Sequence, residues 1–196
     1  MRLYLASRSS ARAELLRELG IPFIIAPADI DEAKIIEQHS DPLDLVEILA
    51  KTKAETVAAD LSGDYIVVGC DTVSVRNGKI LGKPRTKEEA KEMIMMLEKY
   101  PDNQYTGVCV ISPEESFART FHANYIFSGF REVDVDNYIA SGEPFSNAGA
   151  LNPRGKFAGT FGLTVKGYYH ADFSLPLEVL VSVLRTHDLL PDFSKL

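Results

Sequence analysis

The pattern of apolar and polar positions at the start of the chain alternates between short continuous runs and helical spacing. An apolar run over 3–6 leads into an amphipathic stretch over 10–19 that stops at Gly20, and a second apolar run covers 22–26. Short apolar runs bounded by turn residues are typical of strands, whereas apolar residues three or four positions apart are typical of helices. The pattern therefore predicts a strand, a helix and a second strand.

A longer helix is expected to begin at Asp41, because this residue can cap the N-terminus and is followed by Pro42. Proline suits the first helical position, where its missing N–H would have no partner in any case. Lys53 lies at the margin of the expected buried face, so its side chain either reaches into a cleft or extends into solvent. The expected face consists of Leu45, Ile48, Leu49, Thr52 and Thr56.

The middle of the chain carries strand, turn and cap signals in sequence. Residues 65–69 are nearly all apolar, as expected of a strand covered on both faces. An Asn-Gly pair at 77–78 predicts a tight hairpin that returns through 80–81. Thr86, with Glu89 three residues later, predicts a capping box at the start of another helix.

The second half of the chain is richer in strands. Residues 107–111 and 117–127 are expected to form a long antiparallel hairpin around 112–115. The remaining expected features are a short helix that starts at Asp134 or Asp136 and ends at Gly142, an irregular glycine-rich stretch over 149–162, and a closing amphipathic helix over 177–184.

Composition supports a globular chain with a full core, since 45% of the 196 residues are hydrophobic. We expect one α/β domain over 1–196 with two lobes that face each other across a groove. The formal net charge of −7 argues against general binding to nucleic acids or membrane surfaces, because both need an extended basic surface.

Targeting signals and cysteines point to an intracellular protein. No apolar segment approaches the roughly 20 residues that span a bilayer, and the N-terminus lacks the pattern of a signal peptide. Cys70 and Cys109 lie in apolar runs and are expected to be buried free thiols in a reducing compartment. The expected location is the cytoplasm, and the C-terminal Ser-Lys-Leu at 194–196 is interpreted as a coincidental match to a peroxisomal signal.

The segment over 7–12 joins the first expected strand to the first expected helix and is rich in hydroxyl groups. Its serines, backbone N–H groups and arginine would surround a helix N-terminus, where unpaired N–H groups and the helix dipole stabilise an anion. The segment therefore predicts either a phosphate-binding site or a simple junction closed by an N-capping serine.

Two acidic positions follow expected strands. Asp71 is expected to end one strand beside Thr72, and Asp31 with Glu32 follows another. Ligands of open α/β sheets gather at the carboxyl ends of strands, and carboxylates from two strand ends can hold Mg²⁺ beside a phosphate. The alternative interpretation of Asp71 is a residue that caps the following turn.

Several cations could accompany these carboxylates, and Lys83 is the most informative because Gly82 and Pro84 restrict the backbone on either side. Carboxylates, cations and a serine-rich helix start together favour phosphoryl or nucleotidyl chemistry. The sequence contains no P-loop, dinucleotide fingerprint or nucleophile elbow, and its histidines lack metal-ligand spacing. The candidate cations are Arg8, Arg12, Lys53, Lys83 and Arg85.

Short segments spread over almost the whole chain form a combined pattern. They are 5–9, 12, 15–16, 31–32, 50, 53–54, 69–72, 78–84, 89–90, 105–108, 138–144, 148–150 and 175–176. In this order they resemble the Maf family of nucleoside triphosphate pyrophosphatases. Each segment is weak by itself, whereas the combination is specific.

The resemblance implies an α/β fold in which two lobes surround a long twisted mixed sheet, with a nucleotide cleft between them. It also implies metal-dependent hydrolysis of a nucleoside triphosphate to the monophosphate and pyrophosphate, with Mg²⁺ or Mn²⁺ as the metal. By the same resemblance, Asp71 would activate water and, together with Glu32, hold the metal. The residues that would bind the substrate are Ser7, Ser9, Arg12, Lys53, Thr72, Lys83 and Arg154.

Several positions depart from the family pattern. Ser10 and Ala11 replace a proline and the first of two arginines, a usual histidine falls near Asp102, and Leu151 and Arg154 replace a tyrosine and a glutamine. Residues at the first arginine, the glutamine and Thr72 distinguish subgroups with different base preferences. Thr72 fits the thymidine or uridine triphosphate type, but the other two residues fit no recognised pattern, so the base preference stays open. Arg8 or Arg154 could replace the missing arginine.

The leading hypothesis is therefore a pyrophosphatase that protects the nucleotide pool, with a nucleoside triphosphate as its partner; a homodimer is compatible with the sequence. One alternative is a nucleotide-binding regulator of cell division with little catalysis. Another is a metal-dependent phosphomonoesterase, which would release orthophosphate rather than pyrophosphate. The identity of the product distinguishes the three.

Overall fold

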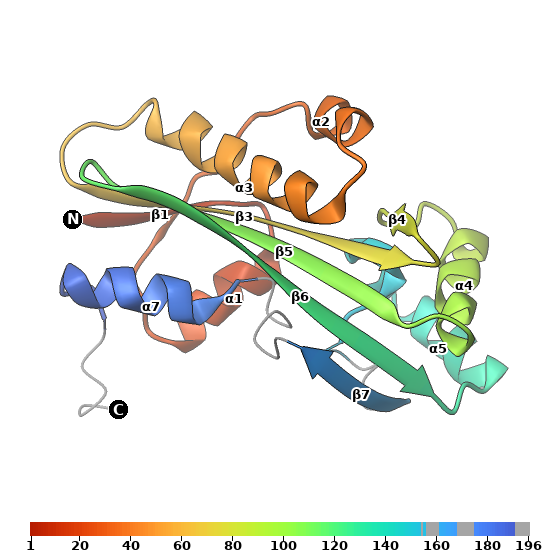
Figure 1. Ribbon diagram of the computed structural model, residues 1–196. Coiled ribbons are helices and arrows are strands. Elements are labelled where there is room, and N and C mark those ends of the chain that lie inside the picture. Colours follow the sequence, from red (N-terminus) through yellow and green to blue (C-terminus); the bar gives the residue numbers. More distant parts are fainter. Residues whose placement is uncertain (154, 156–160, 168–174, 191–196) are drawn as a thin grey trace. The chain divides into compact units, whose positions relative to one another are not determined.

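A computed structural model describes residues 1–153, 155, 161–167 and 175–190 of the chain (Figure 1). A seven-stranded sheet has the order β2-β1-β3-β5-β6-β7, and β4 pairs with β3. Helices flank the sheet, which confirms the predicted mixed α/β fold. No helix in the described ranges is long and apolar enough to cross a membrane.

The chain divides into two compact units. Unit 1 consists of residues 1–71, 106–121 and 173–196, and unit 2 consists of residues 72–105 and 122–172. Three strands contribute residues to both units: β3 (Tyr65–Arg76), β5 (Asp102–Ile111) and β6 (Ser116–Ser128).

The other elements each belong to one unit. Those of unit 1 are β1 (Arg2–Ala6), α1 (Ser10–Glu18), β2 (Ile24–Ile25), α2 (Glu32–Gln38), α3 (Pro42–Ala58) and α7 (Leu177–Thr186). Those of unit 2 are β4 (Lys79–Leu81), α4 (Lys87–Met95), η1 (Met96–Glu98), α5 (Glu132–Ala140), η2 (Glu143–Ser146), η3 (Ala148–Ala150) and β7 (Gly162–Gly167).

In unit 1, β1 lies between two parallel neighbours. Tyr4 is in register with Ile24 of β2 and with Val67 of β3. Parallel neighbours require crossover connections, and α1 and α3 lie in the segments that provide them. The predicted order of strand, helix and strand at the start of the chain is confirmed.

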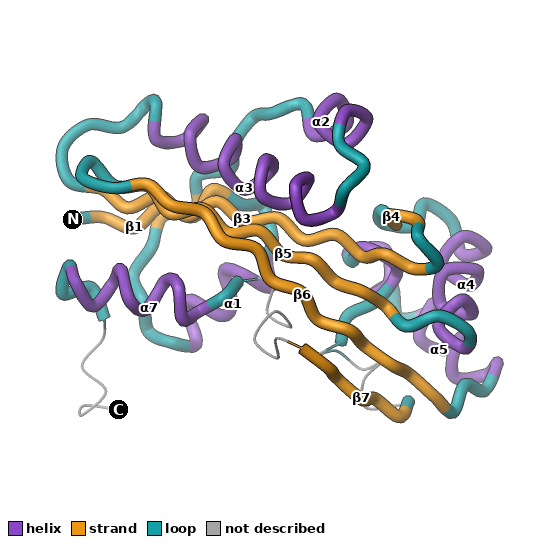
Figure 2. Tube along the Cα trace, viewed as in Figure 1, coloured by secondary structure: helices purple, strands orange, loops and turns teal. Residues whose placement is uncertain are grey.

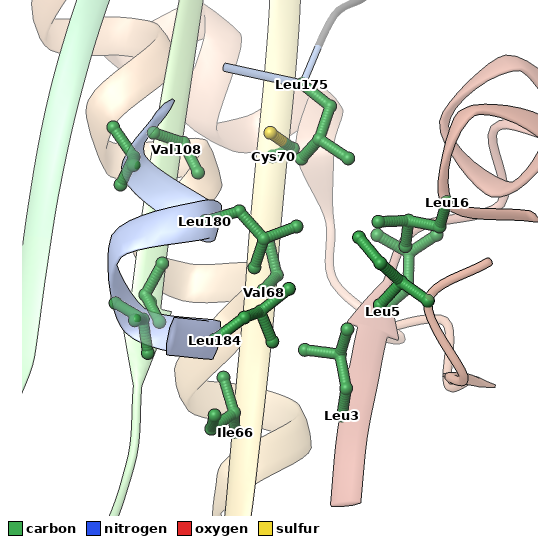
Figure 3. Packing of buried hydrophobic residues seen from close by; sticks show 14 of the residues in the cluster. Leu3, Leu5, Leu16, Ile66, Val68, Cys70, Val108, Leu175, Leu180 and Leu184 are labelled. Carbon is green, nitrogen blue, oxygen red and sulfur yellow. The ribbon is translucent and has the colours of Figure 1, made fainter. Parts of the chain in front are cut away.

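Alternation along the strands gives the sheet of unit 1 two buried faces. On one face, β3 presents Ile66, Val68 and Cys70, and α1 and α7 cover them with leucines that include Leu16 and Leu180 (Figure 3). Helix α3 lies on the other face (Figure 2), and the buried members of this second cluster are Ala6, Val67, Cys109, Ala50 and Ala54. Both cysteines are buried free thiols, as predicted.

Helix α3 lies unusually close to the sheet because glycines face it. A Cβ atom added to Gly69 would lie 2.2 Å from the carbonyl oxygen of Ala50, and one added to Gly107 would lie 2.1 Å from that of Val46. Both distances are shorter than any non-bonded contact, so the two glycines are what allow the helix backbone to rest on the strands.

Local signals in unit 2 were predicted correctly. Asn77 and Gly78 both have positive φ, 49° and 72°, which is the conformation of a tight hairpin turn. The Thr86 hydroxyl accepts a hydrogen bond from the Glu89 N–H at 3.1 Å, while the Glu89 carboxylate accepts one from the Arg85 N–H at 2.7 Å. These contacts cap α4 at the predicted place.

Four expectations about elements are wrong. Helix α2 was not predicted, because it buries no residue and so has no apolar periodicity. Helix α5 begins at Glu132, before either predicted aspartate, and has no side-chain cap. Strand β7 was not predicted: it begins at Gly162, the last residue of the stretch expected to be irregular, and pairs with β6. Finally, β3 does not end at Asp71 but continues to Arg76.

Candidate functional site

The hydroxyl-rich segment of unit 1 contains the N-capping serine expected from its sequence. The Ser9 side chain caps α1 by accepting a hydrogen bond from the Arg12 N–H at 3.4 Å. Arg12 is itself buried, and its Nη1 donates to the Ser7 hydroxyl at 3.0 Å. The Ser9 N–H donates to the same hydroxyl at 3.2 Å. The result is a capped helix start with a guanidinium fixed beside it, which is a suitable arrangement for binding an anion.

Lys53 belongs to the buried face of α3 rather than to its margin. The buried residues of this helix are Leu45, Val46, Leu49, Ala50, Lys53 and Ala54. The predicted buried face was therefore partly wrong. Ile48, Thr52 and Thr56 are only half-buried, whereas Ala50 and Ala54 are buried against the sheet. The close packing of α3 on the sheet, which the sheet glycines permit, therefore also sets the direction of the Lys53 side chain.

Asp71 faces α3 because it shares the strand face of Gly69, two residues before it. Its Oδ1 lies 2.5 Å from the Lys53 Nζ, and the Glu32 Oε1 lies 2.9 Å from the same nitrogen. The Asp71 side chain is 14% exposed and that of Glu32 is 50% exposed. The carboxylate thus pairs with the ammonium of α3 within a strand that continues past it.

Asp31 does not join this cluster, although it was expected to form an acidic site with Glu32. Its carboxylate caps α2 by accepting a hydrogen bond from the Lys34 N–H at 3.1 Å. Glu32 is the first residue of α2 and extends to Lys53 instead. The unpredicted helix α2 thus determines which of the two neighbouring acids reaches the site.

A cavity of about 350 Å³ in unit 1 connects the two clusters. Ser7 and Arg8 line it from the end of β1, and Glu32 and Lys53 line it from α2 and α3. Its remaining wall is formed by Ala6 and residues 27–30. A space of this size, with hydroxyl, cationic and carboxylate groups on its walls, can hold a charged polar ligand.

The other candidate site residues do not belong to unit 1. Thr72 is half-buried in β3, and Lys83 is exposed between Gly82 and the buried Pro84. Arg154 lies outside the described residues. The structure therefore brings together six of the predicted residues: Ser7, Ser9, Arg12, Glu32, Lys53 and Asp71.

Glu32 and Asp71 have the oxygen ligands that a divalent cation prefers. In the described part of the chain, no group of three or more histidine, cysteine, aspartate or glutamate residues is arranged around a common point. Lys53, however, contacts one oxygen each of Glu32 and Asp71, and Glu32 lines the cavity. Mg²⁺ in phosphate-transfer sites is commonly held by one or two carboxylates, with water and substrate phosphates completing its shell.

Comparisons with known proteins show the family to which the chain is related. A family described as Maf-like protein matches residues 2–187. A protein named dTTP/UTP pyrophosphatase from Bacillus cereus is 37% identical over 188 residues, which cover 96% of each chain. One of the same name from Bacillus anthracis is 36% identical over 96% of each chain.

Among solved structures, the chain is similar to a nucleoside-triphosphatase / dITP/XTP pyrophosphatase from Mycobacterium abscessus. It shares 13% sequence identity, with 99% of this chain and 100% of that chain covered, at a TM-score of 0.40. This score is too low to show a common fold.

Proposed function

Because the chain belongs to the Maf family, we propose that it hydrolyses a nucleoside triphosphate to the monophosphate and pyrophosphate. The observation that carries this proposal is the Lys53 ammonium, which joins Asp71 and Glu32 at a cavity that also exposes Ser7. The names of the relatives favour dTTP or UTP as the substrate. An enzyme of this kind would remove unwanted nucleotides from the cytoplasmic pool.

The cations would bind the triphosphate, whose charge is the main feature that the site must compensate. Arg12 and Lys53 are fixed before substrate arrives, since each is buried and hydrogen bonded. Preorganised donors of this kind stabilise negative charge without a reorganisation cost during the reaction. Ser7 and Ser9 would add hydroxyl and backbone donors, and Lys83 is proposed as a further phosphate ligand on the family resemblance alone.

Asp71 would be the proton acceptor of the reaction. A water molecule attacks the α-phosphorus, its proton passes to the Asp71 carboxylate, and the bond from the α-phosphorus to the bridging oxygen breaks to release pyrophosphate. The contact with Lys53 fixes the orientation of this carboxylate. Glu32 and Asp71 would hold Mg²⁺ or Mn²⁺, which supplies charge neutralisation on the phosphates when it is bound.

Base preference is proposed to involve Thr72, which fits the pyrimidine type of the family, together with positions 11 and 154. Ala11 is exposed on α1, next to the buried Arg12. If position 11 contacts the base, Ala11→Arg should change the ratio of kcat/KM between dTTP and a purine triphosphate. An unchanged ratio would exclude this contact.

The proposal is tested by identifying the product. The protein is incubated with dTTP, UTP and a panel of other triphosphates in the presence of Mg²⁺ or Mn²⁺, and pyrophosphate, orthophosphate and remaining triphosphate are measured. We expect pyrophosphate and a monophosphate, and we expect Asp71→Asn to lower kcat by about 100-fold or more, as loss of a general base does.

The other outcomes contradict the proposal. Orthophosphate as the first product would indicate a phosphomonoesterase. A triphosphate that binds and survives prolonged incubation would indicate a nucleotide-binding regulator. Full activity of the Asp71→Asn variant would exclude this residue as the proton acceptor.

A further inference from the structure

A buried ion pair lies in unit 2, outside the residues to which a role in the reaction is assigned. Arg76 and Asp102 are both completely buried, and the Arg76 Nε lies 2.7 Å from the Asp102 Oδ1. The Ser74 hydroxyl donates to the same oxygen, and the Gln104 amide donates to the Oδ2 at 3.0 Å. Buried ion pairs rarely stabilise a fold more than apolar residues of the same volume, so this pair requires another explanation.

The Arg76 guanidinium also binds two backbone carbonyls. Its Nη1 donates to the Met93 oxygen in α4, and its Nη2 donates to the Gly149 oxygen in η3 at 2.7 Å. One side chain thus connects β3 to a helix and to a turn far apart in the sequence. Only the planar, multiply donating guanidinium can make all these contacts at once, because an ammonium is a single point of charge.

The turn that Arg76 holds has an unfavourable backbone conformation. Gly149 and Ala150 have φ values of 62° and 60°, and the left-handed region is unfavourable for alanine. A Cβ atom at Gly149 would lie 2.3 Å from the Ser74 Oγ and 2.8 Å from the Arg76 Nη2, so the turn packs directly on the polar cluster. Such a conformation persists only when its surroundings hold it.

The same turn is joined to the segment that carries Lys83. The Gly149 N–H donates to the carbonyl oxygen of Gly82 at 2.9 Å, and Gly82 directly precedes Lys83. The peptide groups on both sides of Gly149 are therefore bound, one to Arg76 and one to Gly82. Lys83 is exposed, so its direction is set by this backbone rather than by packing of its own side chain.

We propose that Arg76, with Asp102 as its counter-charge, is a positioning residue for substrate binding: it fixes the Gly149 turn, which fixes Gly82 and thereby Lys83. The aspartate at position 102, near which the family pattern has a histidine, is accounted for as the partner of this arginine. The inference rests on the proposed function, since it takes Lys83 as a ligand of the triphosphate.

Two variants separate positioning from mere stability. Arg76→Met combined with Asp102→Asn removes both charges together, and an asparagine at 102 can still bond to Ser74 and Gln104. Arg76→Lys keeps the charge opposite Asp102 but cannot bind the Met93 and Gly149 carbonyls simultaneously. The matched control is Lys91→Met, which removes a surface ion pair of the same unit, where Lys91 lies 2.8 Å from Glu132 and 2.9 Å from Asp136.

Amide exchange of Gly149 by NMR and steady-state kinetics with dTTP are measured on each variant, along with the melting temperature. In the double variant and in Arg76→Lys, we expect Gly149 to exchange about tenfold faster or more. We also expect KM to rise by about tenfold while kcat changes little, because Lys83 would contact the phosphates equally before and during the reaction. Lys91→Met should change neither quantity.

A folded double variant with unchanged Gly149 exchange and unchanged KM would overturn the proposal. If the double variant does not fold, the same two measurements on Arg76→Lys decide. Faster exchange with an unchanged KM would show that Arg76 holds the turn but does not position a substrate ligand, which also overturns it. If the wild-type protein releases no pyrophosphate, the proposed function fails, while the exchange data still test the contact between Arg76 and the turn.

Discussion

At the scale of single residues, Lys53 shows most clearly what the sequence could and could not predict. Its importance followed from the family pattern, but its place on the helix did not, since lysine counts as polar in any periodicity. The actual buried face includes Ala50 and Ala54, which fit against the sheet because Gly69 leaves room for the helix backbone. The position of a charged side chain was therefore decided by small residues around it.

Replacement of Lys53 by methionine should abolish most of the activity. The variant would leave Asp71 and Glu32 without the ammonium that binds both, and the substrate would lose a preorganised cation. We expect kcat/KM for dTTP to fall by about 100-fold or more, as when one electrostatic contact to a transition state is removed. The measurement is steady-state pyrophosphate release.

Lys51→Met, on the same helix, is the matched control for this prediction. Lys51 forms an ion pair with Glu47 one turn away, and both side chains are more than a third exposed. Exposed pairs of this kind contribute little, so its kcat/KM should stay within about twofold of the wild-type value. Equal losses in the two variants would show that charge on α3, rather than the contact with the two acids, supports activity.

At the scale of elements, signals that are local in sequence were predicted correctly and those that depend on tertiary partners were not. The N-cap at Asp41 and the capping box at Thr86 involve backbone groups within four residues, so their chemistry is visible in the sequence. Strand β7 has no such signature, and helix α2 has a local N-cap at Asp31 but was not predicted. Strand β7 exists through pairing with β6, whereas α2 is an exposed helix without a buried apolar face.

Gly107→Ala tests whether the contact between α3 and the sheet is as close as the structure has it. The new methyl group would lie 2.1 Å from the Val46 oxygen, so the helix must move away from β5. We expect the free energy of unfolding, measured by urea titration, to fall by about 2 kcal/mol or more, within the range observed for overpacked cores.

Gly82→Ala provides the comparison for this substitution. A Cβ atom at Gly82 has no neighbour within 4 Å, and its φ lies outside the left-handed region. The free energy of unfolding should therefore change by less than about 0.5 kcal/mol, or rise slightly because alanine restricts the unfolded chain. A similar loss of unfolding free energy in both variants would contradict this prediction. It would mean that a methyl group destabilises the protein at either glycine, whether or not the glycine lies beneath α3.

At the scale of the whole molecule, the sequence predicted the class of fold, but the reasoning that singled out Asp71 rested on a mistaken strand end. Asp71 was expected at the carboxyl end of a strand, where ligands of α/β proteins gather, yet β3 continues past it. The residue is functional in the proposed reaction because it faces α3, not because its strand ends. A nucleotide cleft between two lobes and a single domain over 1–196 stay predictions.

The two cysteines can report on the unfolding of unit 1 as a whole, since they lie on opposite faces of its sheet. Burial raises the pKa of Cys70 and that of Cys109 to about 11 from an ordinary value of 9.0. The folded state therefore holds these protons more tightly than the unfolded chain. This contribution to the stability of the folded state is fully present below pH 9. It is lost as the pH rises through about 11, because the unfolded chain releases these protons first.

Alkylation by iodoacetamide at pH 8 should accordingly be negligible in the folded protein, because only roughly 0.1% of each thiol is ionised there and neither is accessible. In increasing urea, both thiols should become reactive over the same transition as the loss of circular dichroism. Mass spectrometry of the two cysteine peptides separates their rates. If Cys109 reacted well before Cys70, the face beneath α3 would open by itself, and unit 1 would not unfold as one cooperative body.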